Sequence, residues 1–243
     1  MSALLEIREL WGGYQEGVDI LRGVSMEVQQ GEPIGIIGLN GSGKSTLGKA
    51  IMGMIPYRRG SIVFEGEDIT GLKTHELAHR GLAIMQQGGR VFPTLSVWDN
   101  LQLATQANNS EFRIRNSELA EIIPLLRRPK RELQRLMADK LSGGQKHQLS
   151  LAMTLATHPK LVILDEPSAG LSPIAVQEMY DMLNRIRDCW NITTMLIEQK
   201  ISKSVSFCEK NLLVQHGTIS DVFFNDGLSV IEYRMFNSKN NNL

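Results

Sequence analysis

The spacing of apolar side chains along the chain predicts where strands lie. Residues 4–8 and 24–28 alternate, or nearly alternate, apolar and polar side chains, which is typical of antiparallel strands with one solvated face. Residues 32–38, 161–165 and 193–197 contain short, almost continuous apolar runs instead. Runs of this kind predict strands of a parallel sheet, because such strands are buried on both faces.

Two other regions have the spacing of helices. Residues 45–54 carry apolar side chains three or four positions apart, which predicts a helix. Residues 97–158 are rich in leucine and helical in pattern, and Pro124 and Pro129 must divide them into several helices. Strands that alternate with helices, interrupted by one helical block, predict a parallel α/β core with a helical insertion.

Composition favours an ordinary soluble globular protein. The chain has 243 residues, of which 42% are hydrophobic and 21% charged, and its 26 basic and 26 acidic residues cancel. A zero balance gives no reason to expect binding to nucleic acid or to a membrane surface through bulk charge. The apolar runs are far shorter than the roughly 20 residues of a membrane helix, so we expect a cytoplasmic protein.

Two local features are interpreted as structural. Arg127, Arg128, Lys130, Arg131 and Arg135 form a basic run with little aromatic interleaving, which favours a solvated helix face over a nucleic-acid site. The two cysteines, at positions 189 and 208, are not a close-spaced ligand pair, so we expect reduced thiols and no zinc site.

A glycine-rich loop between a predicted strand and a predicted helix matches the phosphate-loop pattern. Its backbone N–H groups and the start of the following helix can hold phosphate oxygens, Lys44 can reach the β- and γ-phosphates, and Ser45 can ligate Mg²⁺. The nucleotide-binding residues predicted here are Gly38, Asn40, Gly41, Ser42, Gly43, Lys44, Ser45 and Thr46. The alternative is a glycine-rich turn before a helix. No Asn-Lys-x-Asp motif is present, which argues against a GTPase.

A second anion-binding helix start is predicted at Leu141–Gln145, the signature loop. Two such helix starts make little sense for one nucleotide in one subunit. We therefore expect Ser142, Gly143, Gly144 and Gln145 to contact a nucleotide that another subunit holds.

Two adjacent carboxylates follow the apolar run at residues 161–164. Asp165, at the carboxyl end of a strand, can hold Mg²⁺ through water, and Glu166 is placed to polarise the attacking water. The alternative is a solvated strand end. Because the apolar run directs both carboxylates to the same end of the sheet as Lys44, the catalytic interpretation is favoured.

The order and spacing of these three motifs resemble those of the ATP-binding cassette (ABC) ATPases along nearly the whole chain. The resemblance implies an ABC-type phosphate-loop ATPase core of α/β class, with an antiparallel β subdomain and a helical subdomain. It implies one domain over residues 1–243, with a catalytic core at about 1–88 and 157–243 and a helical subdomain at about 89–156. It also implies ATP and Mg²⁺ as cofactors.

Further residues follow from the resemblance alone. Tyr14 is similar to the aromatic residue that stacks on adenine. Gln87, which closes a strand predicted at residues 82–85, resembles the glutamine that touches Mg²⁺ and water, with Gln86 as the less favoured neighbour. Gln199 occupies the place of the usual histidine beside the γ-phosphate, and Ser172 that of an aspartate in the loop crossing the dimer interface. An amide can donate a hydrogen bond but cannot carry a proton at neutral pH, so Glu166 and Gln199 are expected to complete the chemistry.

Together, residues 88–97, residues 167–173 and Gln199 after Glu198 resemble the ATPases of Liv-type importers. Gln87 departs from this pattern, because glutamate is expected at that position in their closest members. The resemblance implies import of branched-chain or other amino acids, or of urea and amides. Implied partners are a second ABC ATPase subunit, identical or different, permeases docking near Val91–Leu95, and an extracytoplasmic solute-binding protein. The chain would then lie on the inner face of the cell membrane. A soluble ABC ATPase acting on nucleic acid or a protein complex, or an exporter subunit, remain alternatives, and Phe92 could instead pack internally.

Overall fold

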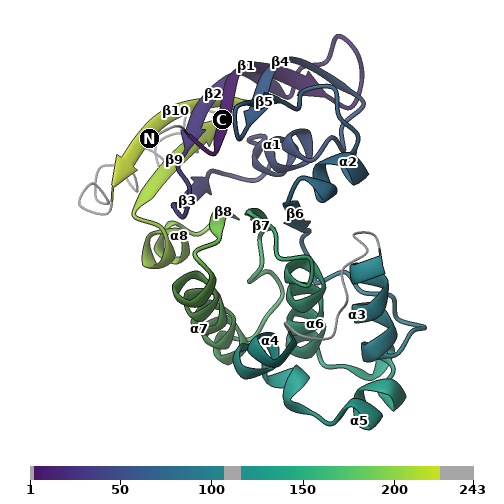
Figure 1. The fold of residues 1–243 in the computed structure, drawn as a ribbon. Helices are drawn as coiled ribbons and strands as arrows, with labels where there is room; N and C mark the ends of the chain where they lie inside the picture. The colour runs from purple at the N-terminus through teal and green to yellow at the C-terminus, as the bar shows by residue number, and fades with distance from the viewer. Residues whose placement is uncertain (1–2, 107–115, 225–243) are drawn as a thin grey trace. The chain divides into compact units, whose positions relative to one another are not determined.

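The computed structural model describes residues 3–106 and 116–224, which form two compact units (Figure 1). Within these ranges, the first unit contains residues 3–74 and 193–224, and the second contains residues 75–106 and 116–192. The predicted helical subdomain at 89–156 therefore belongs to the second unit, together with two strands and a long helix. The division of the chain into a catalytic core and a helical subdomain stays a prediction.

The first unit contains an antiparallel sheet with the strand order β2-β1-β4-β5. Its strands are β1 (Leu5–Gly13), β2 (Leu21–Val28), β4 (Tyr57–Phe64) and β5 (Glu67–Asp68). The alternation predicted at 4–8 buries Leu5 and Ile7, but β1 continues well beyond it. A register shift between Ile7 and Leu10, with Glu9 at φ 48, breaks the alternation without ending the strand.

A second group of strands in this unit has the order β10-β9-β3-β8. Its elements are β3 (Pro33–Ile37), β8 (Thr193–Glu198), β9 (Lys210–Gln215) and β10 (Thr218–Phe224), with the helices α1 (Lys44–Ile51) and α8 (Ile201–Phe207). Strand β3 pairs in parallel with both β8 and β9, whereas β10 is antiparallel to β9. Strand β3 thus lies between two parallel neighbours, and its residues Ile34–Ile37 are buried, as predicted.

The second unit combines two parallel strands with a set of helices. The strands are β6 (Leu82–Met85) and β7 (Leu161–Asp165). The helices are α2 (Thr74–His79, at the boundary between the units), α3 (Val97–Gln106), α4 (Asn116–Ile122), η1 (Pro124–Arg127), α5 (Lys130–Arg135), η2 (Ala138–Lys140), α6 (Gly143–Leu155) and α7 (Pro173–Trp190). Helix α6 packs against α3, η1 and β6.

The leucine-rich region is divided into separate helices at the two prolines, as predicted. Pro124 begins η1, and Pro129 is the N-cap of α5. Arg127, Arg131 and Arg135 are exposed, as expected for a solvated face. Along residues 3–106 and 116–224, none of the helices has the length and hydrophobicity that a membrane span requires.

Candidate functional site

The phosphate loop follows β3 and leads into α1 in the first unit. Gly43, at φ 108, adopts a backbone conformation that L side chains rarely take. A Cβ at Gly38 would lie 2.3 Å from the carbonyl oxygen of Val214, so this position has no room for any side chain. Buried Lys44 donates from Nζ to the carbonyl oxygens of Gly38 and Leu39, both at 2.9 Å. The ammonium group of Lys44 is therefore bound by backbone carbonyls of the same loop.

The loop also contains a buried polar atom that fits an anionic ligand. The hydroxyl oxygen of Ser42 has no hydrogen-bond partner among the described residues. Buried polar atoms normally have one, and a hydroxyl can donate to a phosphate oxygen. Partly buried Ser45 and buried Thr46 lie in the first turn of α1, whose N-terminal N–H groups favour negative charge.

Two other predicted site residues lie in the first unit. Tyr14 is 49% exposed, and the Nζ of Lys49 lies 5.8 Å from the centre of its ring. An exposed aromatic face of this kind can stack on a base. Gln199 is exposed and directly follows β8, so its amide is accessible to a ligand.

In the second unit, the signature loop forms the capped start of α6. The Ser142 side chain accepts a hydrogen bond from Gln145 N at 3.2 Å, and Gln145 Oε1 accepts one from Ser142 N at 3.0 Å. This capping box fixes the turn without any ligand. The remaining N–H groups at the helix start, on Gly143 and Gly144, lie beside a cavity.

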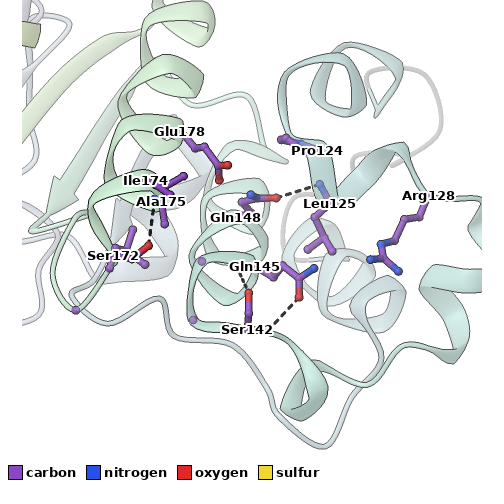
Figure 2. A pocket seen from close by; sticks show the side chains of 14 residues that line it. Pro124, Leu125, Arg128, Ser142, Gln145, Gln148, Ser172, Ile174, Ala175 and Glu178 are labelled. Carbon is purple, nitrogen blue, oxygen red and sulfur yellow. Dashed lines mark hydrogen bonds between the residues drawn. The ribbon is translucent and has the colours of Figure 1, made fainter.

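That cavity has a volume of about 710 Å³ and is open to solvent. Figure 2 shows the capped turn on one side and the start of α7 on the other. There, Ser172 is the N-cap of α7, and its hydroxyl accepts a hydrogen bond from Ala175 N at 3.4 Å. Serine and aspartate are both good N-caps, so a serine at the position where the resemblance predicts aspartate still caps the helix.

The two acidic residues end β7 in the same unit. Asp165 is 3% exposed, whereas the adjacent Glu166 is partly exposed and has a positive φ of 47. Gln87, which follows β6, donates from Nε2 to Glu166 Oε2 at 2.9 Å. The structure thus brings two predicted site residues into direct contact, and it is Gln87 that reaches the carboxylate. Sequence reasoning named both residues but missed this bond, because only the pairing of β6 with β7 makes them neighbours.

Comparison with known proteins identifies the family. The sequence profile described as "ABC transporter" matches residues 21–169. The chain belongs to the ABC transporter family. It is 32% identical to the high-affinity branched-chain amino acid transport ATP-binding protein BraG of Pseudomonas aeruginosa, over 85% of this chain and 87% of BraG. The lipopolysaccharide export system ATP-binding protein LptB of Escherichia coli K12 is 31% identical, over 88% of each chain.

Two further similarities complete the comparison. The probable branched-chain amino acid transport ATP-binding protein LivF of Archaeoglobus fulgidus is 30% identical, over 89% of this chain and 90% of LivF. A solved ATP-binding subunit of an ABC transporter superposes with a TM-score of 0.78 at 26% identity, over 96% of this chain and 94% of that chain. The predicted fold class is therefore confirmed.

Membership in the ABC transporter family makes this chain an ATP-binding ATPase subunit that powers a membrane transporter. The predicted site residues divide between its two units. Those of the first unit are Tyr14, Gly38, residues 40–46 and Gln199; those of the second are Gln87, Ser142, Gly143, Gly144, Gln145, Asp165 and Glu166. Their individual roles stay predictions.

The segment expected to dock a permease also lies in the second unit. Phe92 is 49% exposed, so it does not pack entirely inside the unit, while Val91 and Leu95 are partly buried. Sequence reasoning missed one residue that shapes this segment, the fully buried Asn100 of α3. An amide between the apolar residues Val97 and Leu101 was the available signal, because buried amides require hydrogen-bond partners.

Proposed function

We propose that two ATPase subunits close around ATP and that this closure drives a permease. The phosphate loop would hold the phosphates through its N–H groups and Lys44, and Tyr14 would stack on adenine. The observation that carries the proposal is the start of α6, which is already capped by Ser142 and faces an open cavity of about 710 Å³. A helix start of this kind is ready to bind the phosphates of a nucleotide that another subunit presents.

The hydrolytic roles follow from the chemistry of the side chains. Ser45, Asp165 and Gln87 offer oxygen atoms, the ligands that Mg²⁺ prefers, and the ion would neutralise phosphate charge when bound. Glu166 would accept a proton from the attacking water, with its carboxylate oriented by the hydrogen bond from Gln87. Gln199 would donate a hydrogen bond to the γ-phosphate.

The solute we propose is a branched-chain or other amino acid, or a similar small molecule such as urea or an amide. BraG and LivF, both named as branched-chain amino acid transport proteins, support this choice. Further proposed partners are permeases near Val91–Leu95, a second ATPase subunit and an extracytoplasmic solute-binding protein. The chain would then act at the inner face of the cell membrane, with no nucleic-acid partner.

Export is the second candidate. The similarity to LptB, a lipopolysaccharide export protein, is nearly as high as that to BraG. The site residues bind and hydrolyse nucleotide in the same way in either direction, so the direction depends on the permease.

Uptake in the native cell distinguishes these candidates. The gene is deleted and complemented with the wild-type chain or with Lys44→Ala, which removes the loop cation while leaving the rest of the site. We expect uptake of radiolabelled leucine to be lost on deletion and restored only by the wild-type chain. Unchanged uptake of leucine, other amino acids, urea and amides would refute the import proposal, and loss of surface lipopolysaccharide would then support export.

Purification from membranes tests the partners. Recovery with permeases would support the proposed assembly, and recovery with ribosomes or DNA in place of permeases would contradict it.

A further inference from the structure

Residues 91–97, the docking segment, are paired with residues 136–139, the pre-signature segment. The three backbone hydrogen bonds between them run from Val97 N to Leu136 O (2.8 Å), from Ala138 N to Leu95 O (3.0 Å) and from Asp139 N to Pro93 O (3.1 Å). Ser96 and Met137 form an antiparallel bridge between these bonds. The pre-signature segment ends only a few residues before Ser142, so a displacement of the docking segment would reach the signature loop through a short piece of chain.

One buried side chain makes several hydrogen bonds to the backbone of the docking segment. Asn100, which is 0% exposed, accepts a hydrogen bond at Oδ1 from Phe92 N at 2.8 Å. Its Nδ2 donates to Phe92 O at 3.0 Å and to Ser96 O at 2.9 Å, with a longer contact of 3.4 Å to Leu95 O. Both ends of the amide are therefore occupied by backbone groups of the segment. A fully satisfied buried amide makes such a turn rigid.

A second contact links the same stretch of chain to α6. The backbone of Gly89, at φ 59, lies against His147, because a Cβ on this glycine would be 2.9 Å from Nδ1. His147 Nδ1 lies 3.0 Å from the carbonyl oxygen of Gly143. A carbonyl can only accept, so Nδ1 carries the hydrogen and donates it. The His147 imidazole thus contacts Gly89, which lies two residues before the docking segment, and Gly143 of the signature loop.

We propose that Asn100 is a positioning residue that makes the docking segment and the signature loop move as one body. Motion of a permease at Phe92 would then reach Ser142 and Gly143 directly, and nucleotide contact at the signature loop would reach the docking surface in return. Such coupling is reciprocal, since each site biases the same structural element. This inference rests on the proposed function, in which the signature loop contacts a nucleotide held by another subunit.

Hydrogen–deuterium exchange on the full chain tests the coupling. The parent is Glu166→Gln, which is expected to hydrolyse ATP at least about 100-fold more slowly, and exchange is compared with and without MgATP for peptides covering residues 91–97 and 136–145. In the parent we expect MgATP to slow exchange at least about fivefold in both peptides, the lower end of typical allosteric coupling. With Asn100→Ala added, we expect the response at 136–145 to persist while that at 91–97 falls to about the level without nucleotide. The control is Gln102→Ala, at an exposed position of the same helix.

Each result is decisive. A response at 136–145 with none at 91–97 in the parent overturns the inference but leaves the nucleotide clamp standing. Equal responses in the Asn100→Ala and Gln102→Ala variants also overturn it, even where the first variant melts at a lower temperature, because its role is then structural only. No response in either peptide, with ATP binding verified by equilibrium dialysis, refutes the proposed clamp itself. Should Asn100→Ala fail to fold, Asn100→Ser and Gly89→Ala interrupt the two links separately and must weaken the same response.

Discussion

Replacing Glu166 with glutamine separates nucleotide binding from hydrolysis. The substitution keeps the shape of the side chain and its ability to accept the hydrogen bond from Gln87 Nε2, now 2.9 Å long. It removes the negative charge that would draw a proton from water. The backbone at position 166 has a positive φ of 47, which strains glutamate and glutamine equally, so the substitution does not change the backbone strain.

The two expected effects differ in size. A hydrogen bond to a charged acceptor exceeds a neutral one by about 1 kcal/mol, which is an upper bound for the lost stability because this pair is solvent-accessible. Loss of a general base slows the reaction by about 10²–10⁴-fold. At 1.36 kcal/mol per decade, this is about 3–5 kcal/mol of activation free energy. The chemical effect should therefore dominate.

The assay measures phosphate release and the binding of a fluorescent ATP analogue on the same preparation. We expect phosphate release to fall by at least about 100-fold while the dissociation constant changes by less than about threefold. Glu209→Gln, at an exposed position, serves as the control because it makes the same charge change away from the site. Release at the wild-type rate would show that Glu166 is not the base.

Three further substitutions test other parts of the structure. Gln199→His should keep phosphate release within about threefold of wild type if the amide only donates to phosphate; a larger loss would reveal a specific role for the amide. Gly35→Ala would place a Cβ 2.1 Å from Asn211 Oδ1 in the core, and urea denaturation should show a loss of about 3 kcal/mol. Unchanged stability would mean that the core can shift. Ser142→Ala removes the acceptor for Gln145 N, so it should cost about 1 kcal/mol in thermal unfolding and reduce ATP-driven dimerisation in light scattering. Full dimerisation would contradict the clamp.

Local patterns predicted the elements that surround the site. The run at 161–165 forms β7, and the loop after residue 37 leads into α1, because strand burial and glycine-rich turns depend on neighbouring residues. The hairpin of β9 and β10 and the short helix α8 were not predicted. Strand β9 depends on pairing with a distant partner, β3, and β10 in turn pairs with β9. The bond from Gln87 to Glu166 also joins residues far apart in the sequence, so it became visible only in three dimensions.

The pairing of β3 also affects how the protein is made. The phosphate loop leaves the ribosome early, but β8 and β9, the strands that flank β3, come from the last quarter of the chain. Gly217 N, which donates to Ser42 O at 2.9 Å, is made later still. Contacts between such distant residues form slowly, and domains fold as units only once their parts are present. We therefore expect a growing chain to be unable to bind nucleotide until β8, β9 and Gly217 have been made.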